Sequence, residues 1–381
     1  MFELTKEQSE IKKAAKEFAE GEFTDIAREL DEKGCFDDRL WKKAAELGFL
    51  AVFIPEKYDG MGMGYLEQCL IVEEFARVDL GITHAIESTF FGSQLIEMVG
   101  TEEQKKRYLP PICLGEVRMG MAITEPDAGS DVAAVSTEAV KEGDEYIING
   151  GKVFITNCKS ADFLVALCVT DPDNPKIHHR FSTIIVDTDR PGYEGVPYHG
   201  KLSLRTSESG DATFKNVRVP VSNLLGKEGN GFYNIMNFFN RSRVQVAALA
   251  VGTAQGALDK AVAHVRQRKQ FGSPLAGLQL VQGKIAEMVT KTEAARSICY
   301  RAAGKLDMNQ ADPALSSMAK WYCAEVAVQV ADEAIQLHGG YGILEEYNVA
   351  HYWRNAKVLE IFEGSKEVEK VIIAKKILGR F

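Results

Sequence analysis

The feature that most constrains the fold of this chain is that its hydrophobic periodicity changes twice along the 381 residues. In the first block apolar residues recur at spacings of three and four, for example at Ile11, Ala14 and Phe18, which is the period of a helix. Strand-like runs replace this spacing in the middle block, and helical spacing returns in the last block. A sheet inserted between two helical blocks predicts an α+β fold. We expect an N-terminal helical domain at residues 1–119, a middle β domain at 120–228 and a C-terminal helical domain at 229–381.

The middle block predicts several short strands. The expected strands are at 146–148, 153–156, 163–167 and 183–186, where β-branched and aromatic residues gather. Turn residues at 149–151 are expected to separate the first two strands, and a polar loop at 171–180 to separate the last two.

Composition excludes several kinds of partner and site. The net charge of −9 argues against a nucleic-acid partner held through phosphate contacts. Seven scattered cysteines without a CxxC pair are typical of reduced thiols, so we expect a cytoplasmic location and no disulfide framework. The adjacent His178 and His179 would face opposite sides of a strand and have no carboxylate or cysteine at ligand spacing. We therefore expect no metal site.

The sequence also predicts neither a signal peptide nor a membrane span. The chain opens with a capping box, Thr5 to Gln8, and continues into a charged helix. Polar residues interrupt the most apolar stretch, 244–263, which predicts a buried helix rich in small residues.

Glu363 is the candidate proton base. It lies in an apolar stretch and is followed by Gly364 and Ser365. Desolvation raises the pKa of a carboxyl group toward neutrality and makes it a usable base. A following glycine lets the backbone approach a ligand closely. The alternative is a plain helix ending, because Glu-Gly often follows an apolar run.

Two segments of the middle block are candidates for binding a phosphate and a flat ring. Gly129, Ser130 and the exposed N–H groups of the turn at 124–131 would form an anion nest; the alternative is an acidic surface turn. Phe154 and Thr156 are two residues apart and would share one face of a strand, where a ring and a hydroxyl could contact a cofactor. The alternative is an ordinary amphipathic strand.

Two segments of the last block could bind a nucleotide. The basic cluster at 266–272 ends a predicted helix, where it would either complement the helix dipole or bind a diphosphate. The glycines of 336–342 would form either a C-cap or a backbone approach to a nucleotide. We interpret His338, which has no partner visible in sequence, as structural.

Taken in order, these segments resemble the acyl-CoA dehydrogenase family of flavoproteins, and the likeness runs across essentially the whole chain. The matching segments are 124–131, 152–157, 216–220, 225–232, 268–272, 336–342 and 354–365. The resemblance implies an N-terminal helical domain, a middle β-barrel-like domain and a C-terminal four-helix bundle. It also implies FAD bound between the domains and near a neighbouring subunit, in a homotetramer.

Carried over position by position, the resemblance implies that Glu363 is the catalytic base. The implied FAD contacts are Ile123, Thr124, Gly129 and Ser130; Phe154 and Thr156, which cover the flavin ring; Arg268, Gln270 and Phe271, which reach a neighbour's FAD; and Gln336, Gly339, Gly340, Ser365 and Glu367. The implied substrate contacts are His84, Glu87, Phe91, Ser130, Asn240, Arg243, Phe362 and Gly364. Two positions depart from common members: Phe362 replaces a frequent tyrosine, and Asn240 replaces a frequent aspartate.

The implied reaction is α,β-dehydrogenation of an acyl-CoA thioester. Glu363 removes the α-proton, the β-hydrogen leaves as hydride to the flavin, and electrons pass to an electron-transfer flavoprotein. Bulky Phe91 and Phe362 favour a short, branched or ring-shaped acyl group. His84 and Glu87 would add polarity to its pocket, unless Glu87 only hydrogen-bonds inside the helical domain. A glutaryl-type substrate is not expected, since this stretch lacks an arginine to pair with a second carboxylate.

Three alternatives remain open from sequence. The same base and flavin would serve an enoyl-CoA reductase fed by a flavoprotein donor. The fold would also serve a flavin oxidase or monooxygenase, against which the glutamate at position 363 argues. A non-enzymatic acyl-CoA or nucleotide-binding module would carry no flavin.

Overall fold

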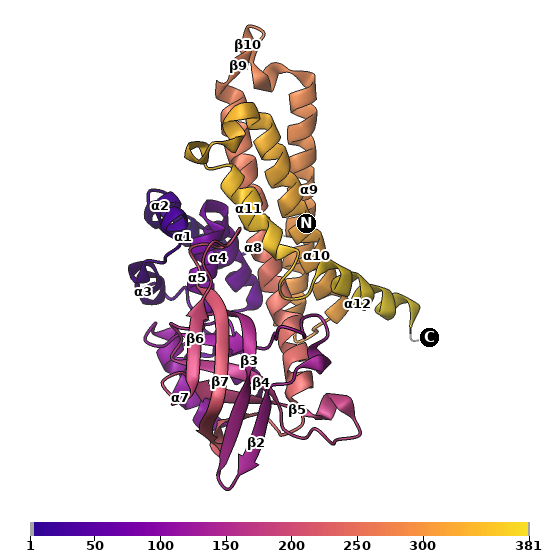
Figure 1. The fold of residues 1–381 in the computed structure, drawn as a ribbon. Coiled ribbons are helices and arrows are strands. Elements are labelled where there is room, and N and C mark those ends of the chain that lie inside the picture. Colours follow the sequence, from indigo (N-terminus) through magenta and orange to yellow (C-terminus); the bar gives the residue numbers. More distant parts are fainter. Residues whose placement is uncertain (1–3, 380–381) are drawn as a thin grey trace.

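The computed structural model describes residues 4–379 and confirms the α+β class: in chain order a sheet domain follows one set of helices and precedes another (Figure 1). The first set contains α1 (Lys6–Glu22), α2 (Ala27–Lys33), α3 (Asp38–Glu46), α4 (Tyr65–Val78), α5 (Leu80–Ser88), α6 (Ser93–Val99) and α7 (Glu102–Cys113). The predicted capping box begins α1: Thr5 Oγ1 accepts from the Gln8 N–H at 3.1 Å, and Gln8 Oε1 accepts from the Thr5 N–H at 3.0 Å.

The middle domain is built around one eight-stranded sheet. Its strands are β1 (Met119–Ala122), β2 (Glu138–Glu142), β3 (Glu145–Thr156), β4 (Phe163–Val169), β5 (Phe181–Asp187), β6 (Tyr193–Pro197), β7 (Ser209–Pro220) and β8 (Leu224–Leu225). Their order is β6-β7-β3-β2-β4-β5-β8, and β1 pairs in parallel with β4, with Met119 opposite Phe163. The alternately buried residues of these strands form a core of their own, which includes Tyr146, Ile148 and Phe214.

The expected break at 149–151 is wrong, because the two predicted strands form one continuous strand, β3. The ladder to β7 passes through this segment with register shifts between Ile148 and Gly150 and between Lys152 and Ile155. A β-bulge absorbs extra residues without ending the pairing, which is why the glycines do not make a turn here. At Gly150 a side chain would lie only 2.5 Å from Thr137 Oγ1, so close packing also requires a glycine.

The C-terminal helices confirm the predicted return to helical structure. They are α8 (Gly231–Gln267), α9 (Gln279–Asp307), α10 (Pro313–His338), α11 (Ala350–Leu359) and α12 (Lys366–Leu378), and the hairpin of β9 (Lys269–Gln270) and β10 (Ser273–Pro274) joins α8 to α9. Short 3₁₀ turns lie at Glu56–Tyr58, Val132–Ala134, Ile177–His179, Val221–Asn223, Leu275–Gly277, Gly339–Ile343 and Glu345–Tyr347.

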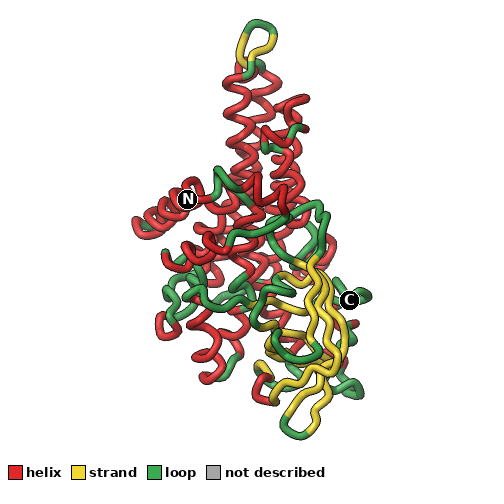
Figure 2. The backbone as a smooth tube through the Cα atoms, turned by 60° about the vertical axis from the view of Figure 1, so that its left-hand side comes forward, coloured by secondary structure: helices red, strands yellow, loops and turns green. Residues whose placement is uncertain are grey.

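Helix α8 is the central element of the molecule, because α4, α9 and α10 all pack against it. Small residues allow this close approach: a side chain at Gly252 would lie 2.2 Å from the carbonyl oxygen of Glu73 on α4. In Figures 1 and 2 the hairpin β9–β10 lies at one end of the long helices and the sheet lies toward the other end, while α12 projects from the body. Among residues 4–379 no helix combines the length and the apolar character that crossing a bilayer requires.

Candidate active site

The turn between α11 and α12 carries Glu363. Helix α11 ends at Leu359, and α12 begins at Lys366 with Ser365 as its N-cap, whose Oγ lies 3.5 Å from the Val368 amide. A helix does end here, as the alternative interpretation of Glu-Gly supposed. However, Glu363 itself adopts a left-handed φ of +55°, which is strained for a residue with a side chain and typically costs about 1–3 kcal/mol. Such strain is concentrated at functional sites.

The carboxyl group and the backbone of Glu363 are both held by hydrogen bonds from α8. Ser242 Oγ donates to Glu363 Oε2 at 2.6 Å, and the Arg243 Nε–H donates to the backbone oxygen of Glu363 at 3.3 Å. Loss of hydration raises the pKa of Glu363, while Ser242, Arg243 and Lys320 act in the opposite direction. The residue is only half-buried, so a ligand can still reach its carboxyl group. A desolvated but accessible carboxylate is what proton abstraction from a weak carbon acid requires.

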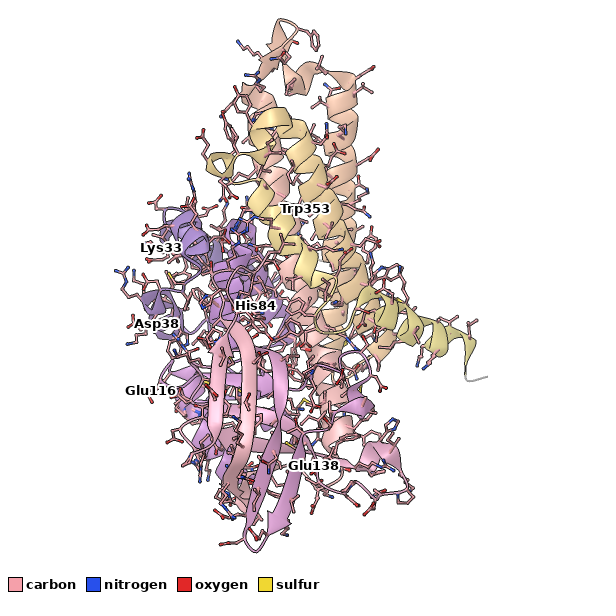
Figure 3. The ribbon with its side chains drawn as sticks, in the orientation of Figure 1. Lys33, Asp38, His84, Glu116, Glu138 and Trp353 are labelled. Carbon is pink, nitrogen blue, oxygen red and sulfur yellow. The ribbon has the colours of Figure 1, made fainter. Side chains whose placement is uncertain are left out.

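Three of the predicted substrate contacts lie near this turn. The ring of His84 on α5 is 5.8 Å from the ring of Phe362, and its Nδ1 hydrogen-bonds Ser207 Oγ at 2.9 Å. Figure 3 labels His84 where the N-terminal helices, the sheet and the long helices come together. Burial lowers the pKa of His84 to about 4, so the ring is neutral. Burial, and then the negative charge of Glu363, raise the pKa of Glu87 to about 8. The site therefore places the carboxyl group of Glu363 near a second carboxyl, that of Glu87, which is mostly protonated at neutral pH.

Phe91 and Asn240 lie beside this group, and their roles toward a substrate stay predictions. The ring of Phe91 packs edge-on against Phe238 at 5.2 Å, on the side of the N-terminal core. The backbone oxygen of Asn240 accepts from Ser316 Oγ at 2.7 Å, and the residue is partly exposed.

A second group of predicted residues lies on the middle domain. The Val153 N–H donates to the Thr124 oxygen at 2.9 Å, so the segment of Ile123 and Thr124 runs beside the part of β3 that carries Phe154 and Thr156. Phe154 has a φ of +59° and is 70% exposed, which is rare for a phenylalanine. Gly129 and Ser130 are exposed in the same region. This surface offers an apolar ring, a hydroxyl and free backbone N–H groups to one ligand.

The third group lines a cavity of about 620 Å³ at the far end of the long helices. Arg268, Gln270, Gln336, Gly339 and Gly340 all line it, together with His264, His338 and Tyr341. The guanidinium of Arg268 lies over the ring of Tyr341 at 5.2 Å. Phe271 is 92% exposed beside it. A cation, flat rings and open glycine backbone suit an aromatic base carrying a phosphate.

The second and third groups do not meet within one chain. The strand β3 belongs to the sheet, and the hairpin β9–β10 lies beyond the opposite end of the helices in both views (Figures 1 and 2). The structure thus keeps the Arg268 group apart from the Phe154 surface. Ser365 and Glu367 lie with neither distant group: they begin α12, next to Glu363.

Sequence reasoning missed four residues that support these sites. Ser242 hydrogen-bonds Glu363, Lys320 and Glu369 are fully buried near it, and Lys152 is fully buried under the Ile123 segment. Lys152 Nζ donates to Glu125 Oε1 at 2.8 Å, to the Ile123 oxygen at 3.0 Å and to the Leu167 oxygen at 2.7 Å. The available signal was a lone charge inside an apolar stretch, as at Lys152 and Lys320.

Comparison with known families and proteins follows the same three parts of the chain. The model described as acyl-CoA dehydrogenase, N-terminal domain, matches residues 5–116, that of the middle domain matches 120–217, and that of the C-terminal domain matches 229–378. An acryloyl-CoA reductase (NADH) of Anaerotignum propionicum is 39% identical over 381 residues, which is 100% of this chain and 96% of that protein. A 3-(aryl)acrylate reductase of Clostridium sporogenes is 38% identical and covers 98% of this chain and 99% of its own.

Solved structures agree over the same length. A chain in the structure of the electron transferring flavoprotein of Acidaminococcus fermentans, a study of flavin-based electron bifurcation, superposes with a TM-score of 0.96 at 38% identity, and 100% of each chain is covered. The butyryl-CoA dehydrogenase of Megasphaera elsdenii superposes with a TM-score of 0.95 at 36% identity, covering 99% of this chain and 100% of its own.

Proposed function

The chain belongs to the acyl-CoA dehydrogenase family, whose members are FAD oxidoreductases, and we propose that it moves hydrogen between a short, branched or ring-containing acyl-CoA and its 2-enoyl-CoA, with Glu363 as the base. The observation that carries this proposal is the half-buried, hydrogen-bonded carboxyl of Glu363 on a strained turn. FAD supplies the acceptor for the electron pair that leaves the β-carbon. Glu363 accepts the α-proton, and Ser242 orients its carboxyl group.

FAD is the cofactor of this chain, and two sets of residues fit its chemistry. Ile123, Thr124, Gly129, Ser130, Phe154 and Thr156 would hold the flavin ring and the adjoining phosphates from the middle domain. The Phe154 ring supports this assignment, since it contacts Tyr198 at its edge yet stays largely exposed, as an apolar ring at a ligand-binding surface does. Arg268, Gln270, Phe271 and the glycines after α10 would hold the remaining nucleotide.

The separation of these two sets supports a homo-oligomer, for which we propose the tetramer expected from sequence. One FAD cannot touch both sets in a single chain, so a neighbouring copy would bring its Arg268 group to the Phe154 surface. An electron-transfer flavoprotein is the proposed electron partner, because a matching chain comes from a structure of such a protein. Free thiols at all seven cysteines, six of them buried, support the proposed cytoplasmic location.

The reverse reaction, reduction of a 2-enoyl-CoA, is the second candidate. The relatives from Anaerotignum propionicum and Clostridium sporogenes are named as reductases of acrylate-type compounds. In that direction the same base would return the α-proton. The aryl relative also favours a ring-containing acyl group. The protonated Glu87 and the neutral His84 could then hydrogen-bond a polar substituent on that ring.

One experiment tests the reaction and its direction. The purified, FAD-bound protein is mixed without oxygen with CoA thioesters of short linear, branched and aryl acids, and loss of the oxidised flavin absorbance is followed. The chemically reduced protein is then mixed with the matching enoyl-CoA esters, and return of the absorbance is followed. We expect at least one pair of acyl-CoA and enoyl-CoA esters to change the flavin absorbance in both experiments. The faster of the two half-reactions indicates the favoured direction.

A protein that folds but binds no FAD, or whose flavin responds to no thioester in either experiment, would contradict the proposal. A reduced flavin that reacts with oxygen faster than with any enoyl-CoA would identify an oxidase or monooxygenase instead. The free acids without CoA are the matched controls.

A further inference from the structure

Charged side chains from three helices gather beneath the turn that carries Glu363. Arg243 comes from α8, Lys320 from α10 and Glu369 from α12. Lys320 and Glu369 are fully buried, and Arg243 is nearly so. Burying a charge is costly unless an opposite charge or a set of hydrogen bonds compensates it. Packing alone therefore does not account for three charged side chains buried at one place.

Both cations contact the backbone of the turn. Lys320 Nζ donates to the oxygen of Gly364 at 2.5 Å, and the Arg243 Nε–H donates to the oxygen of Glu363 at 3.3 Å. Two consecutive carbonyl groups thus face buried cations. This arrangement fixes the peptide that joins Glu363 to Gly364, and with it the direction in which the Glu363 side chain leaves the backbone.

Glu369 completes the cluster from below. Its Oε1 lies 2.9 Å from Arg243 Nε. A side chain placed on Gly364 would lie 2.0 Å from this same oxygen, and the φ of Gly364 is +102°. Glycine at 364 thus makes room for Glu369. Glycine at this position would thus serve two ends, close approach of a ligand and space for the Glu369 carboxyl group.

We propose that Glu369, together with Arg243 and Lys320, positions the general base: the three side chains hold the Glu363–Gly364 turn in its left-handed conformation and set the charge that the Glu363 carboxyl experiences. This inference rests on the proposed function, because it takes Glu363 to be the base.

The charges act on Glu363 with opposite signs. Arg243 and Lys320 lower the pKa of Glu363, whereas Glu369 raises it. Burial lowers the pKa of Lys320 to about 8, so Lys320 is charged below that pH. The other groups that face the cluster are Ser242 on α8, Ser317 on α10, Glu360 at the end of α11 and Glu87 on α5. Removing a positive charge of the cluster should therefore raise the pKa of Glu363, and removing the negative charge of Glu369 should lower it.

The test compares Glu369→Gln, Lys320→Met and the double variant in the FAD-bound protein, with butyryl-CoA as the probe. The measured quantity is the pH dependence of kcat/KM for flavin reduction, whose acid limb reports the base of the free enzyme. We expect Glu369→Gln to move this limb to lower pH and Lys320→Met to move it to higher pH. A unit charge inside a protein shifts the pKa of a neighbouring group by on the order of one pH unit.

The double variant keeps the net charge of the cluster, so its acid limb should return close to that of wild type. Exposed Glu287→Gln, the same chemical change on α9, is the control and should leave the limb in place.

Several results would overturn the inference. If the acid limbs of the single variants coincide with that of wild type, or if both limbs move in the same direction, the charges of the cluster do not set the pKa of Glu363. Loss of bound FAD from all three variants would make it a packing element only. If wild type reduces its flavin with butyryl-CoA and Glu363→Gln does not, but the limbs stay fixed, only this inference fails. If wild type responds to no thioester, the proposed function fails first.

Discussion

The hydroxyl of Ser242 donates a 2.6 Å hydrogen bond to Oε2 of Glu363, and the two residues are 121 positions apart in the sequence. A hydroxyl donor stabilises the ionised form of a carboxyl group, so Ser242 opposes the rise in pKa that burial causes at Glu363. This contact also selects one rotamer of the base. A single hydroxyl group thus influences both the orientation and the proton affinity of the carboxylate.

Replacing Ser242 with Ala should therefore raise the pKa of Glu363 and slow flavin reduction at neutral pH. A hydrogen bond to a charged group is worth about 1.5–3 kcal/mol, and the partial exposure of Glu363 favours the lower end, or about one pH unit. The acid limb of kcat/KM should move up by that amount. Ser242→Thr keeps the hydroxyl and should keep the limb; a limb that stays in place in Ser242→Ala would refute the role of this contact.

Replacing Glu363 with Gln should leave FAD and CoA-thioester binding nearly intact and remove the proton acceptor. General-base catalysis contributes about 10²–10⁴-fold, so flavin reduction by a thioester should slow by at least that range. The spectral change on ligand binding should survive, and stopped-flow absorbance measures both quantities. If the variant reduced its flavin at close to the wild-type rate, the base would have to be sought at Glu87, the other carboxyl near the site.

The helical and strand blocks could be predicted because their periodicities are long and regular. The sequence did not reveal that β3 continues through Asn149 and Gly150, because whether such a pair turns or bulges depends on the partner strand β7. Local patterns specify which residues can form a strand, while pairing decides where that strand ends.

The candidate base could be predicted, but its supports could not. Glu363 stands out because an apolar stretch, a glycine and a hydroxyl surround it in sequence. Ser242, Lys320 and Glu369 lie on three different helices, and only the packing of α8, α10 and α12 brings them to one place. Nothing in the spacing of these residues along the chain encodes that meeting.

Replacing Lys152 with Met should destabilise the protein and weaken FAD binding. Lys152 is fully buried and forms an ion pair with Glu125 at 2.8 Å, so the change leaves a buried carboxylate without its cation, at a cost of about 3–5 kcal/mol. The same Nζ binds the oxygen of Ile123, which holds the segment that we assign to the flavin. Flavin release on heating, followed by its fluorescence, should begin at a lower temperature than in wild type.

The paired change Lys152→Met/Glu125→Gln should recover much of the stability lost in Lys152→Met, because no unpaired charge remains. The control is Lys141→Met on the exposed face of β2, which should release flavin at the wild-type temperature. A Lys152→Met protein as stable as this control would contradict the assignment.

The thermal stability should fall as pH rises from about 6.5 to 9, because of His351. Burial would lower the pKa of His351, but the carboxylates of Asp79, at 2.7 Å, and Asp31 outweigh it and raise the pKa to about 9. A raised pKa stabilises the fold fully below the unfolded value and loses that contribution as pH passes the folded value. The full contribution is on the order of 3 kcal/mol. In His351→Gln the decline of Tm over this window should flatten, whereas exposed His199→Gln should retain it; equal slopes in the two variants would exclude His351 as the cause.

Two variants that each lack half of the FAD site should rescue each other when their chains are mixed. Phe154→Ala damages the surface on the middle domain, and Arg268→Glu damages the cavity at the far end of the helices; both residues lie at the surface, so both chains should fold. If each FAD contacts Phe154 of one chain and Arg268 of its neighbour, a mixed pair contains one intact site. Random pairing puts unlike chains in about half of all pairs, so about a quarter of the sites should bind FAD after co-expression, although either variant alone binds little. Flavin content per chain measures this fraction. Mixed samples that bind no more flavin than the average of the two separate variants would mean that both halves of the site come from one chain, which the distance between β3 and the hairpin β9–β10 argues against.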